Sequence, residues 1–247
     1  MTARRLVGVG VGPGDPELVT VKAVRVLREA DVVLVPVLAE HAPGRAEATV
    51  RAHLADDTRL RRVVFALDER AGVTPRRADA WDAAAATVHA AYAGGAATVA
   101  FATIGDPNVY STFGYLAQTV RAQDPTVVVA TVPGVTAMQD LAARSGTVLC
   151  EGTESLALLP LTAGLPAYEA ALRQFDTVVA YKGGANLPAV LDVLDRAGRL
   201  GDAVYGAALG LPGEDLRPAA DLDRRAAGPY LATVLAPPPR GRRGGRL

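Results

Sequence analysis

The chain has 247 residues, 50% of them hydrophobic, and its 26 Lys and Arg residues balance 26 Asp and Glu residues. A chain of this length can bury the core of one large or two modest domains, and zero net charge offers no bulk electrostatic case for binding nucleic acid or a membrane surface. The single cysteine, Cys150, excludes a disulfide framework or a thiolate metal cluster within one chain and indicates a reducing compartment.

The N-terminal segment predicts a strand, a glycine-rich loop and a helix. An apolar run from Leu6 enters Gly8-Val9-Gly10-Val11-Gly12-Pro13-Gly14-Asp15, and an apolar-periodic helix follows over 20–30. Glycines at this spacing indicate a tightly turning backbone that another molecule can approach closely. The dinucleotide fingerprint is not met, because Pro13 replaces its third glycine, and Lys22 lies too far beyond the loop for a P-loop. A glycine-rich turn without a ligand remains the alternative.

The first half of the chain continues as alternating strands and helices. We predict strands over 31–35, 61–67 and 97–102 and helices over 44–54, 74–94 and 112–123. The first of these strands should stop at Pro36. Such alternation predicts right-handed crossovers and a mostly parallel sheet, with ligands at the carboxyl ends of its strands. The loop at 12–15 and the turn at 105–107 both follow strands, so we expect them to face one cleft.

The second half is expected to form a separate α/β domain with a mixed sheet. We place the junction at Asp124-Pro125, between an N-terminal domain of residues 1–123 and a C-terminal domain of residues 124–236. This half carries predicted strands over 126–131, 156–159, 177–181, 203–209 and 230–235 and a helix over 188–196. The last strand is expected to be antiparallel, because little sequence remains for a helical crossover.

The two ends of the chain carry little apolar sequence. Residues 237–247 contain three prolines and then arginines among glycines, which predicts a disordered basic tail. The first apolar run is broken by glycines and Pro13, so we expect neither a signal peptide nor a membrane span, and we expect a cytoplasmic protein.

Residues suited to metal or nucleophilic catalysis are few. The histidines His41, His53 and His89 are not spaced as metal ligands, and no serine lies in a Gly-x-Ser-x-Gly elbow. Asp15 and Asp106 stand out instead, since each lies in a Gly/Pro turn at a strand end. Such an aspartate can cap backbone amides or touch a ligand, and the sequence leaves both roles open.

Four ordered segments resemble the tetrapyrrole methyltransferases that use S-adenosylmethionine. They are GVGPGDPELVTVKA in the first loop and helix, ATIGDPNVYSTFGYL over 102–116, VPGVTAM over 132–138 and VAYKGG over 179–184. The resemblance covers nearly the whole chain. The run at 110–113 and the closing segment at 229–234 are also similar to the subgroup that methylates precorrin-2 at meso carbon 20, in cobalamin biosynthesis.

The resemblance implies two α/β domains with the cofactor in a cleft between them, a tetrapyrrole substrate and a homodimer. From the charge balance and the residue pattern we expect no metal, nucleic acid or membrane partner. Carried over position by position, the cofactor-binding residues are Pro13, Ile104, Gly105, Asp106, Val109, Thr136, Ala137, Lys182 and Leu209. Lys182 stands where the family often has methionine, and a cation would repel a sulfonium, so we expect Lys182 to contribute its backbone only.

The substrate-binding residues implied by the resemblance are Asp15, Tyr110, Ser111 and Thr112, with Asp106 and Tyr110 as candidates to accept a proton or steady the macrocycle. Packing of Tyr110 as the first aromatic residue of a helix is the alternative. Three other functions stay open: methylation of another tetrapyrrole carbon or of a cobalt-loaded substrate, non-catalytic tetrapyrrole binding, and nucleotide-dependent oxidoreduction, which Pro13 disfavours.

Overall fold

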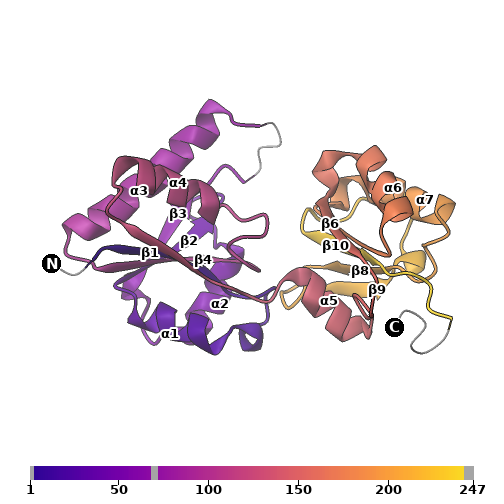
Figure 1. Ribbon diagram of the computed structural model, residues 1–247. Helices are drawn as coiled ribbons and strands as arrows, with labels where there is room; N and C mark the ends of the chain where they lie inside the picture. Colours follow the sequence, from indigo (N-terminus) through magenta and orange to yellow (C-terminus); the bar gives the residue numbers. More distant parts are fainter. Residues whose placement is uncertain (1–2, 68–71, 242–247) are drawn as a thin grey trace. The chain divides into compact units, whose positions relative to one another are not determined.

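The computed structural model describes residues 3–67 and 72–241, which form two α/β units, Met1–Thr136 and Ala137–Leu247 (Figure 1). Each unit contains one five-stranded sheet with helices on both faces, so the predicted α/β class is confirmed. No helix in the described part of the chain is long and apolar enough to cross a membrane.

The first unit is an all-parallel sheet in the order β3-β2-β4-β1-β5. Its elements are β1 (Arg5–Gly10), α1 (Val21–Glu29), β2 (Val32–Val37), α2 (Arg45–His53), β3 (Leu60–Val64), α3 (Pro75–Ala93), β4 (Thr98–Thr103), α4 (Phe113–Gln123) and β5 (Val128–Val132). These match the predicted elements of the first half, with ends shifted by a few residues. Helix α3 begins as expected, since the Thr74 hydroxyl accepts from the Arg77 amide.

Side chains of this sheet alternate between two apolar layers. Leu6 and Phe101 pack with α3 and α4 on one face, whereas Val7, Val9 and Ala100 pack with α1 and α2 on the other. Figure 1 shows the two helix pairs on opposite sides of the sheet. A strand buried on both faces has the continuous apolar sequence that made these segments recognisable.

Two predictions about the first unit are wrong. The strand β5 belongs to this sheet and not to the second half, because it pairs in parallel with β1, with Leu6 beside Val129. The junction expected after residue 123 therefore lies further along, at 136–137. Strand β2 also runs through Pro36 to Val37. This is possible because β2 pairs with β4 only as far as Leu34, so the missing amide of Pro36 leaves no ladder bond unmade.

The second unit has a mixed sheet in the order β6-β7-β10-β8-β9, as predicted. Its elements are α5 (Ala137–Ser145), β6 (Leu156–Pro160), α6 (Leu165–Gln174), β7 (Thr177–Tyr181), α7 (Leu187–Arg196), β8 (Val204–Ala207), β9 (Asp215–Pro218) and β10 (Ala232–Ala236). Strand β10 is antiparallel to both of its neighbours, which confirms the expectation for the last strand. Helices α6 and α7 cover one face and α5 the other (Figure 1).

Helix α6 and strand β9 have no counterpart among the predicted elements. Helix α6 follows Gly164 and has proline in its first turn, and it is fixed by the burial of Tyr168 and Leu172. Strand β9 is four residues long and forms only by pairing with β8, with Tyr205 opposite Arg217. Both depend on contacts distant in sequence.

The tail prediction is wrong for the residues that can be checked. Arg240 forms an ion pair with Glu154, whose side chain is fully buried, and donates to the Val148 carbonyl at 3.0 Å. Arg199 meanwhile donates to the carbonyls of Ala236 and Pro237. Residues 237–241 are therefore attached to the second unit. The remainder of the predicted tail, 242–247, lies outside the described residues.

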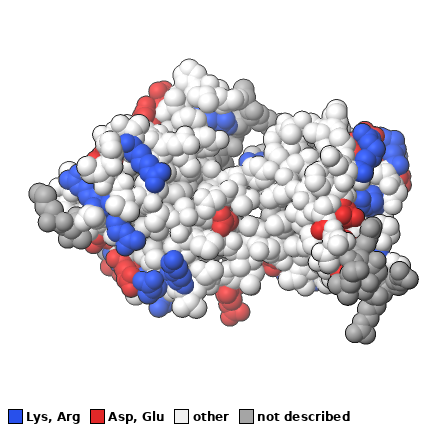
Figure 2. Space-filling view, viewed as in Figure 1, with Lys and Arg blue, Asp and Glu red and all other residues white. Residues whose placement is uncertain are grey.

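Charged side chains are dispersed over the surface. Figure 2 shows Lys and Arg in small groups on the face drawn, with Asp and Glu near them and uncharged surface over much of the rest. The pattern agrees with the balanced composition of the chain.

Candidate functional site

Three glycine turns meet at the carboxyl ends of β1, β4 and β5. A Cβ added to Gly10 would lie 2.5 Å from the Gly105 carbonyl oxygen and 2.6 Å from the Gly134 nitrogen. The Gly105 amide donates to the Gly12 carbonyl at 2.8 Å, and both residues have left-handed backbones, with φ of 67° and 75°. Only glycine allows three backbones to approach so closely, which explains why side chains are missing here.

These turns also lie where the connections of the sheet diverge. The chain leaves β1 for α1 on one face and leaves β4 for α4 on the other, and β1 and β4 are neighbours in the sheet. Open α/β sheets bind ligands at the carboxyl ends of strands whose connections diverge in this way. Within the first unit, the structure thus brings together the predicted segments around Pro13, Gly105 and Thr136.

The two turn aspartates bind backbone amides. Asp106 accepts from the Asn108 amide at 2.8 Å and, through its other oxygen, from the Gly134 amide at 3.0 Å. Asp15 accepts from the Glu17 amide at 2.8 Å and caps the short turn that follows. Asp106 therefore joins the turn after β4 to the turn after β5.

Three described residues other than glycine have left-handed backbones, namely Tyr110, Lys182 and Ala208, with φ of 49°, 62° and 48°. Such conformations are costly for residues with a Cβ and concentrate at functional sites. Tyr110 and Lys182 are predicted site residues, and Ala208 precedes Leu209, which is another. The strain therefore coincides with the predicted site in both units.

Ser111, the residue after Tyr110, is held by two hydrogen bonds before α4 begins. The Ser111 hydroxyl donates to the Thr103 hydroxyl at 3.1 Å and accepts from the Phe113 amide at 3.1 Å. Thr112 occupies the N-cap position of α4, but its side chain makes no capping bond. The Tyr110 side chain is 44% exposed, and partial burial raises the pKa of its phenol.

In the second unit, β7 and α5 are linked through Tyr181. Its hydroxyl accepts from the Met138 amide at 2.9 Å, which brings the predicted residues Ala137 and Lys182 into one neighbourhood. The Lys182 amide donates to the Ala232 carbonyl, and its ammonium lies 6.0 Å from the centroid of the Tyr230 ring. Leu209 is buried in an apolar cluster beside α5, so a ligand could reach only its backbone.

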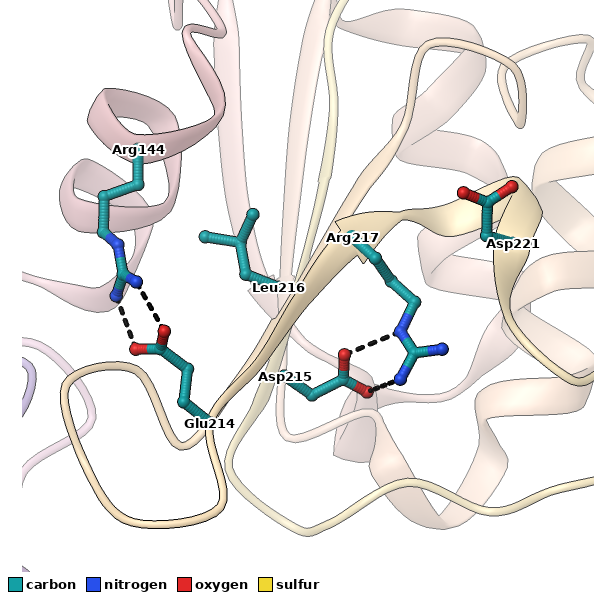
Figure 3. Close-up of a pocket in the computed structure, with 6 residues that line it drawn as sticks. All are labelled: Arg144, Glu214, Asp215, Leu216, Arg217 and Asp221. Carbon is teal, nitrogen blue, oxygen red and sulfur yellow. Dashed lines mark hydrogen bonds and ion pairs between the residues drawn. The ribbon is translucent and has the colours of Figure 1, made fainter.

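The second unit also contains a pocket of about 660 Å³, and four of its charged lining side chains form two ion pairs (Figure 3). Arg144 of α5 forms a two-pronged ion pair with Glu214, and Asp215 binds Arg217. Hydrogen bonds from Arg144 and from the Gly210 amide lower the pKa of Glu214 to about 2. None of the predicted site residues lines this pocket, and Glu214 also accepts from the Gly210 amide in the loop after β8.

Sequence reasoning missed two side chains that contact the glycine-rich loop, Thr49 and His53 of α2. Their spacing of four places both on one face of the helix, which was the available signal. Neither has a partner nearby in sequence.

The turns of the first unit leave space at Gly105 and lie beside a negative charge. Around Gly105 there is room, since the nearest atom to an added Cβ is the Thr136 Cα at 4.0 Å. The Asp106 carboxylate adjoins the turns, and its negative charge disfavours an anionic pyrophosphate there. Within the described residues, no group of three or more His, Cys, Asp and Glu side chains is arranged to hold a metal ion.

Comparison with known proteins gives sequence relatives over most of the chain. A protein named cobalamin biosynthesis protein CobIJ, from Mycobacterium tuberculosis, is 35% identical over 96% of this chain, which spans only about half (47%) of the length of that relative. A precorrin-2 C(20)-methyltransferase from Sinorhizobium sp is 34% identical over 81% of this chain and 82% of its own. A cobalt-precorrin-2 C(20)-methyltransferase from Salmonella typhimurium is 29% identical over 94% and 95% of the two chains.

Solved structures share the fold. A cobalt precorrin-4 methyltransferase, CbiF, matches 94% of both chains with a TM-score of 0.69 at 22% identity. A uroporphyrin-III C-methyl transferase from Thermus thermophilus, complexed with S-adenosyl homocysteine, matches 94% of this chain and 97% of its own with a TM-score of 0.63 at 24% identity. The family model described as tetrapyrrole (corrin/porphyrin) methylases matches residues 5–223. The chain therefore belongs to the tetrapyrrole (corrin/porphyrin) methylases.

Proposed function

We propose that the chain transfers a methyl group from S-adenosylmethionine to carbon 20 of precorrin-2 or its cobalt complex, in cobalamin biosynthesis. One observation carries the proposal. The chain is similar to two relatives named for methylation at this carbon, and each similarity covers most of both proteins. Uroporphyrinogen-III C-methyltransferases of Pseudomonas aeruginosa and Cyanidium caldarium match only 15% and 19% of this chain, so the carbon-20 reaction is the better supported.

The methyl donor is proposed to contact the glycine turns of the first unit. S-adenosylmethionine supplies a methyl group already activated by a positively charged sulfur. Glycine backbones let a ligand approach main-chain donors and acceptors directly, and a structural neighbour is complexed with the spent form of this donor. The donor-binding residues proposed in this unit are Pro13, Ile104, Gly105, Asp106, Val109 and Thr136. Ala137 and the backbones of Lys182 and Leu209 are proposed as further contacts.

The chain's own contribution to the reaction is to hold its reactants in place. The C–S bond breaks as the new C–C bond forms, and the proton on the accepting carbon leaves to Asp106 or water, while Tyr110 is proposed to steady the macrocycle. Alignment of two reactants is worth roughly 7–11 kcal/mol in model systems. Asp106 contributes by fixing the turns after β4 and β5 through its two amide contacts.

Tyr110 is proposed to hydrogen-bond the tetrapyrrole, with Asp15, Ser111 and Thr112 beside it. A tyrosine phenol is protonated at neutral pH, and partial burial raises the pKa of Tyr110 further, so its hydroxyl can donate to a substrate carboxylate or carbonyl. The Ser111 hydroxyl donates to Thr103 and accepts from the Phe113 amide, so one lone pair remains to accept from a further donor. A homodimer is proposed on the family resemblance.

One experiment tests the reaction. Purified protein is incubated with S-adenosylmethionine and, separately, precorrin-2, its cobalt complex and uroporphyrinogen III, and the products are weighed by mass spectrometry and located by NMR. The proposal expects one added methyl group at carbon 20 of the first or second compound. Methylation only of uroporphyrinogen III, or no transfer together with no calorimetric binding of S-adenosylhomocysteine, would contradict it.

A further inference from the structure

Two side chains of α2 hold the backbone of the glycine-rich loop. The Thr49 hydroxyl donates to the Gly14 carbonyl at 3.1 Å, and Thr49 is fully buried. One turn later, His53 Nε2 lies 2.8 Å from the Pro16 carbonyl oxygen. A carbonyl oxygen can only accept, so this nitrogen carries the proton. The two contacts fix carbonyls on both sides of Asp15.

Helix α2 is itself fixed to the sheet. The buried Glu47 carboxylate accepts from Arg62 of β3 through both of its oxygens, each at 2.8 Å, and from Arg51 of α2. At the other end of the helix, the His53 carbonyl accepts from Arg28 of α1 at 3.0 Å. Thr49 and His53 therefore project from a helix that is held at both ends.

The loop needs such support because of its composition. Strand β1 ends at Gly10, and two of the five residues from Val11 to Asp15 are glycines, which gain more backbone freedom when released than any other residue. A ligand that binds a mobile loop must bear the entropy of ordering it, whereas a pre-ordered loop avoids that cost. On the sheet side the loop is held by the Gly105 amide on Gly12. Helix α2 supplies two further contacts, one to Gly14 and one to Pro16, the residue after the loop.

We propose that Thr49 and His53 are positioning residues that pre-order the glycine-rich loop and thereby set the affinity for the methyl donor. This inference rests on the proposed function in that the loop is taken to contact the donor. It assigns a role to α2, which carries none of the predicted site residues.

The test compares Thr49→Val with Thr49→Ser and with the matched control Thr177→Val. Valine keeps the shape of threonine and removes the hydroxyl. Thr177 is also fully buried and donates to a loop carbonyl, that of Leu149 at 2.7 Å, but it lies in the second unit and outside the proposed site. Both valine variants remove a hydroxyl from a fully buried threonine and leave one carbonyl without that partner, so a general loss of stability affects both.

Two readouts are measured on the full chain. The first is amide hydrogen exchange of residues 10–18 without ligand, where Thr49→Val is expected to speed exchange about five- to tenfold while Thr177→Val changes nothing. The second is calorimetric titration with S-adenosylhomocysteine, where Thr49→Val should weaken binding by a similar factor and Thr49→Ser should restore it. In turnover, KM for the donor should rise while kcat at saturation stays the same.

His53→Gln and His53→Ala provide an independent arm. A glutamine amide can replace the Nε2 donor, so it should keep the loop protected, whereas alanine should not. Unchanged exchange over residues 10–18 in both Thr49→Val and His53→Ala would overturn the proposal. Faster exchange with donor affinity unchanged would also overturn it, because the contacts would then be structural only. If the unmodified protein binds no S-adenosylhomocysteine, the proposed function fails, and the exchange data still decide whether α2 orders the loop.

Discussion

At the scale of the residue, Gly134 shows how much depends on a missing side chain. A Cβ at this position would overlap the carbonyl oxygen of Gly105 and the backbone of Gly10. We expect Gly134→Ala to lower the free energy of unfolding by about 1–3 kcal/mol, because rigid backbones must move apart. S-adenosylhomocysteine should bind at least about tenfold more weakly, since the moved turns are the proposed donor contacts. Urea denaturation and calorimetry measure the two effects.

The matched control for Gly134→Ala is Gly114→Ala, an exposed glycine in α4 around which an added Cβ meets nothing within 4 Å. Alanine should stabilise the helix there by about 0.5–1 kcal/mol and leave donor binding unchanged. If the two variants had the same free energy of unfolding and the same donor affinity, the close approach of the three turns would contribute neither to stability nor to binding.

Tyr110 offers a second test at this scale. Removal of its hydroxyl in Tyr110→Phe leaves the ring and the left-handed backbone in place. If the phenol donates to the tetrapyrrole, KM for the tetrapyrrole should rise about five- to tenfold, while binding of S-adenosylhomocysteine stays the same. Unchanged steady-state kinetics would favour the packing role that the sequence left open. Because partial burial raises the pKa of this phenol, its protonated form should persist throughout the neutral range.

At the scale of the element, α2 depends on one buried carboxylate. Hydrogen bonds from Arg62, Arg51 and the Gly44 amide lower the pKa of Glu47 from 4.5 to about 2. A carboxyl group with a lower pKa in the folded state stabilises the fold above its unfolded pKa, and this contribution is lost as pH falls through the folded value. The contribution of ionised Glu47 to the free energy of unfolding should therefore be fully present above about pH 4.5 and be lost as the pH falls towards 2.

Glu47→Gln tests this dependence. We expect the free energy of unfolding to fall by about 2 kcal/mol at pH 7, because two arginines lose a shared carboxylate. The difference from the unmodified protein should narrow as the pH of the urea titration is lowered below 4.5. Glu29→Gln is the control, since its pair with Arg25 is exposed and should be worth less than about 1 kcal/mol. A pH-independent difference would refute the assignment.

At the scale of the whole molecule, the sequence predicted what local pattern determines. Apolar runs and caps such as Thr74 located most strands and helices, and the glycine spacing located the turns that meet. Contacts between residues that are distant in sequence were not predicted. The pairing of β5 with β1, the short β9, and the reach of Thr49 to the Gly14 carbonyl depend on partners that no local window contains. The ion pair between Arg240 and Glu154 was not predicted, for the same reason.

The position of β5 makes the unit boundary testable. Strand β1 is an interior strand because β4 and β5 flank it, and Val132 of β5 is buried in the apolar layer beneath α1 and α2. A fragment ending at Gln123 lacks β5 and exposes the backbone edge of β1, whereas one ending at Thr136 keeps all five strands. We expect fragment 1–136 to unfold cooperatively and fragment 1–123 to aggregate or to lose cooperativity, because an exposed apolar edge pairs with other chains. Thermal unfolding followed by circular dichroism, with light scattering, distinguishes them. Equal stability of the two fragments would show that β5 contributes nothing to the first unit and would return the junction to the Asp124-Pro125 dipeptide.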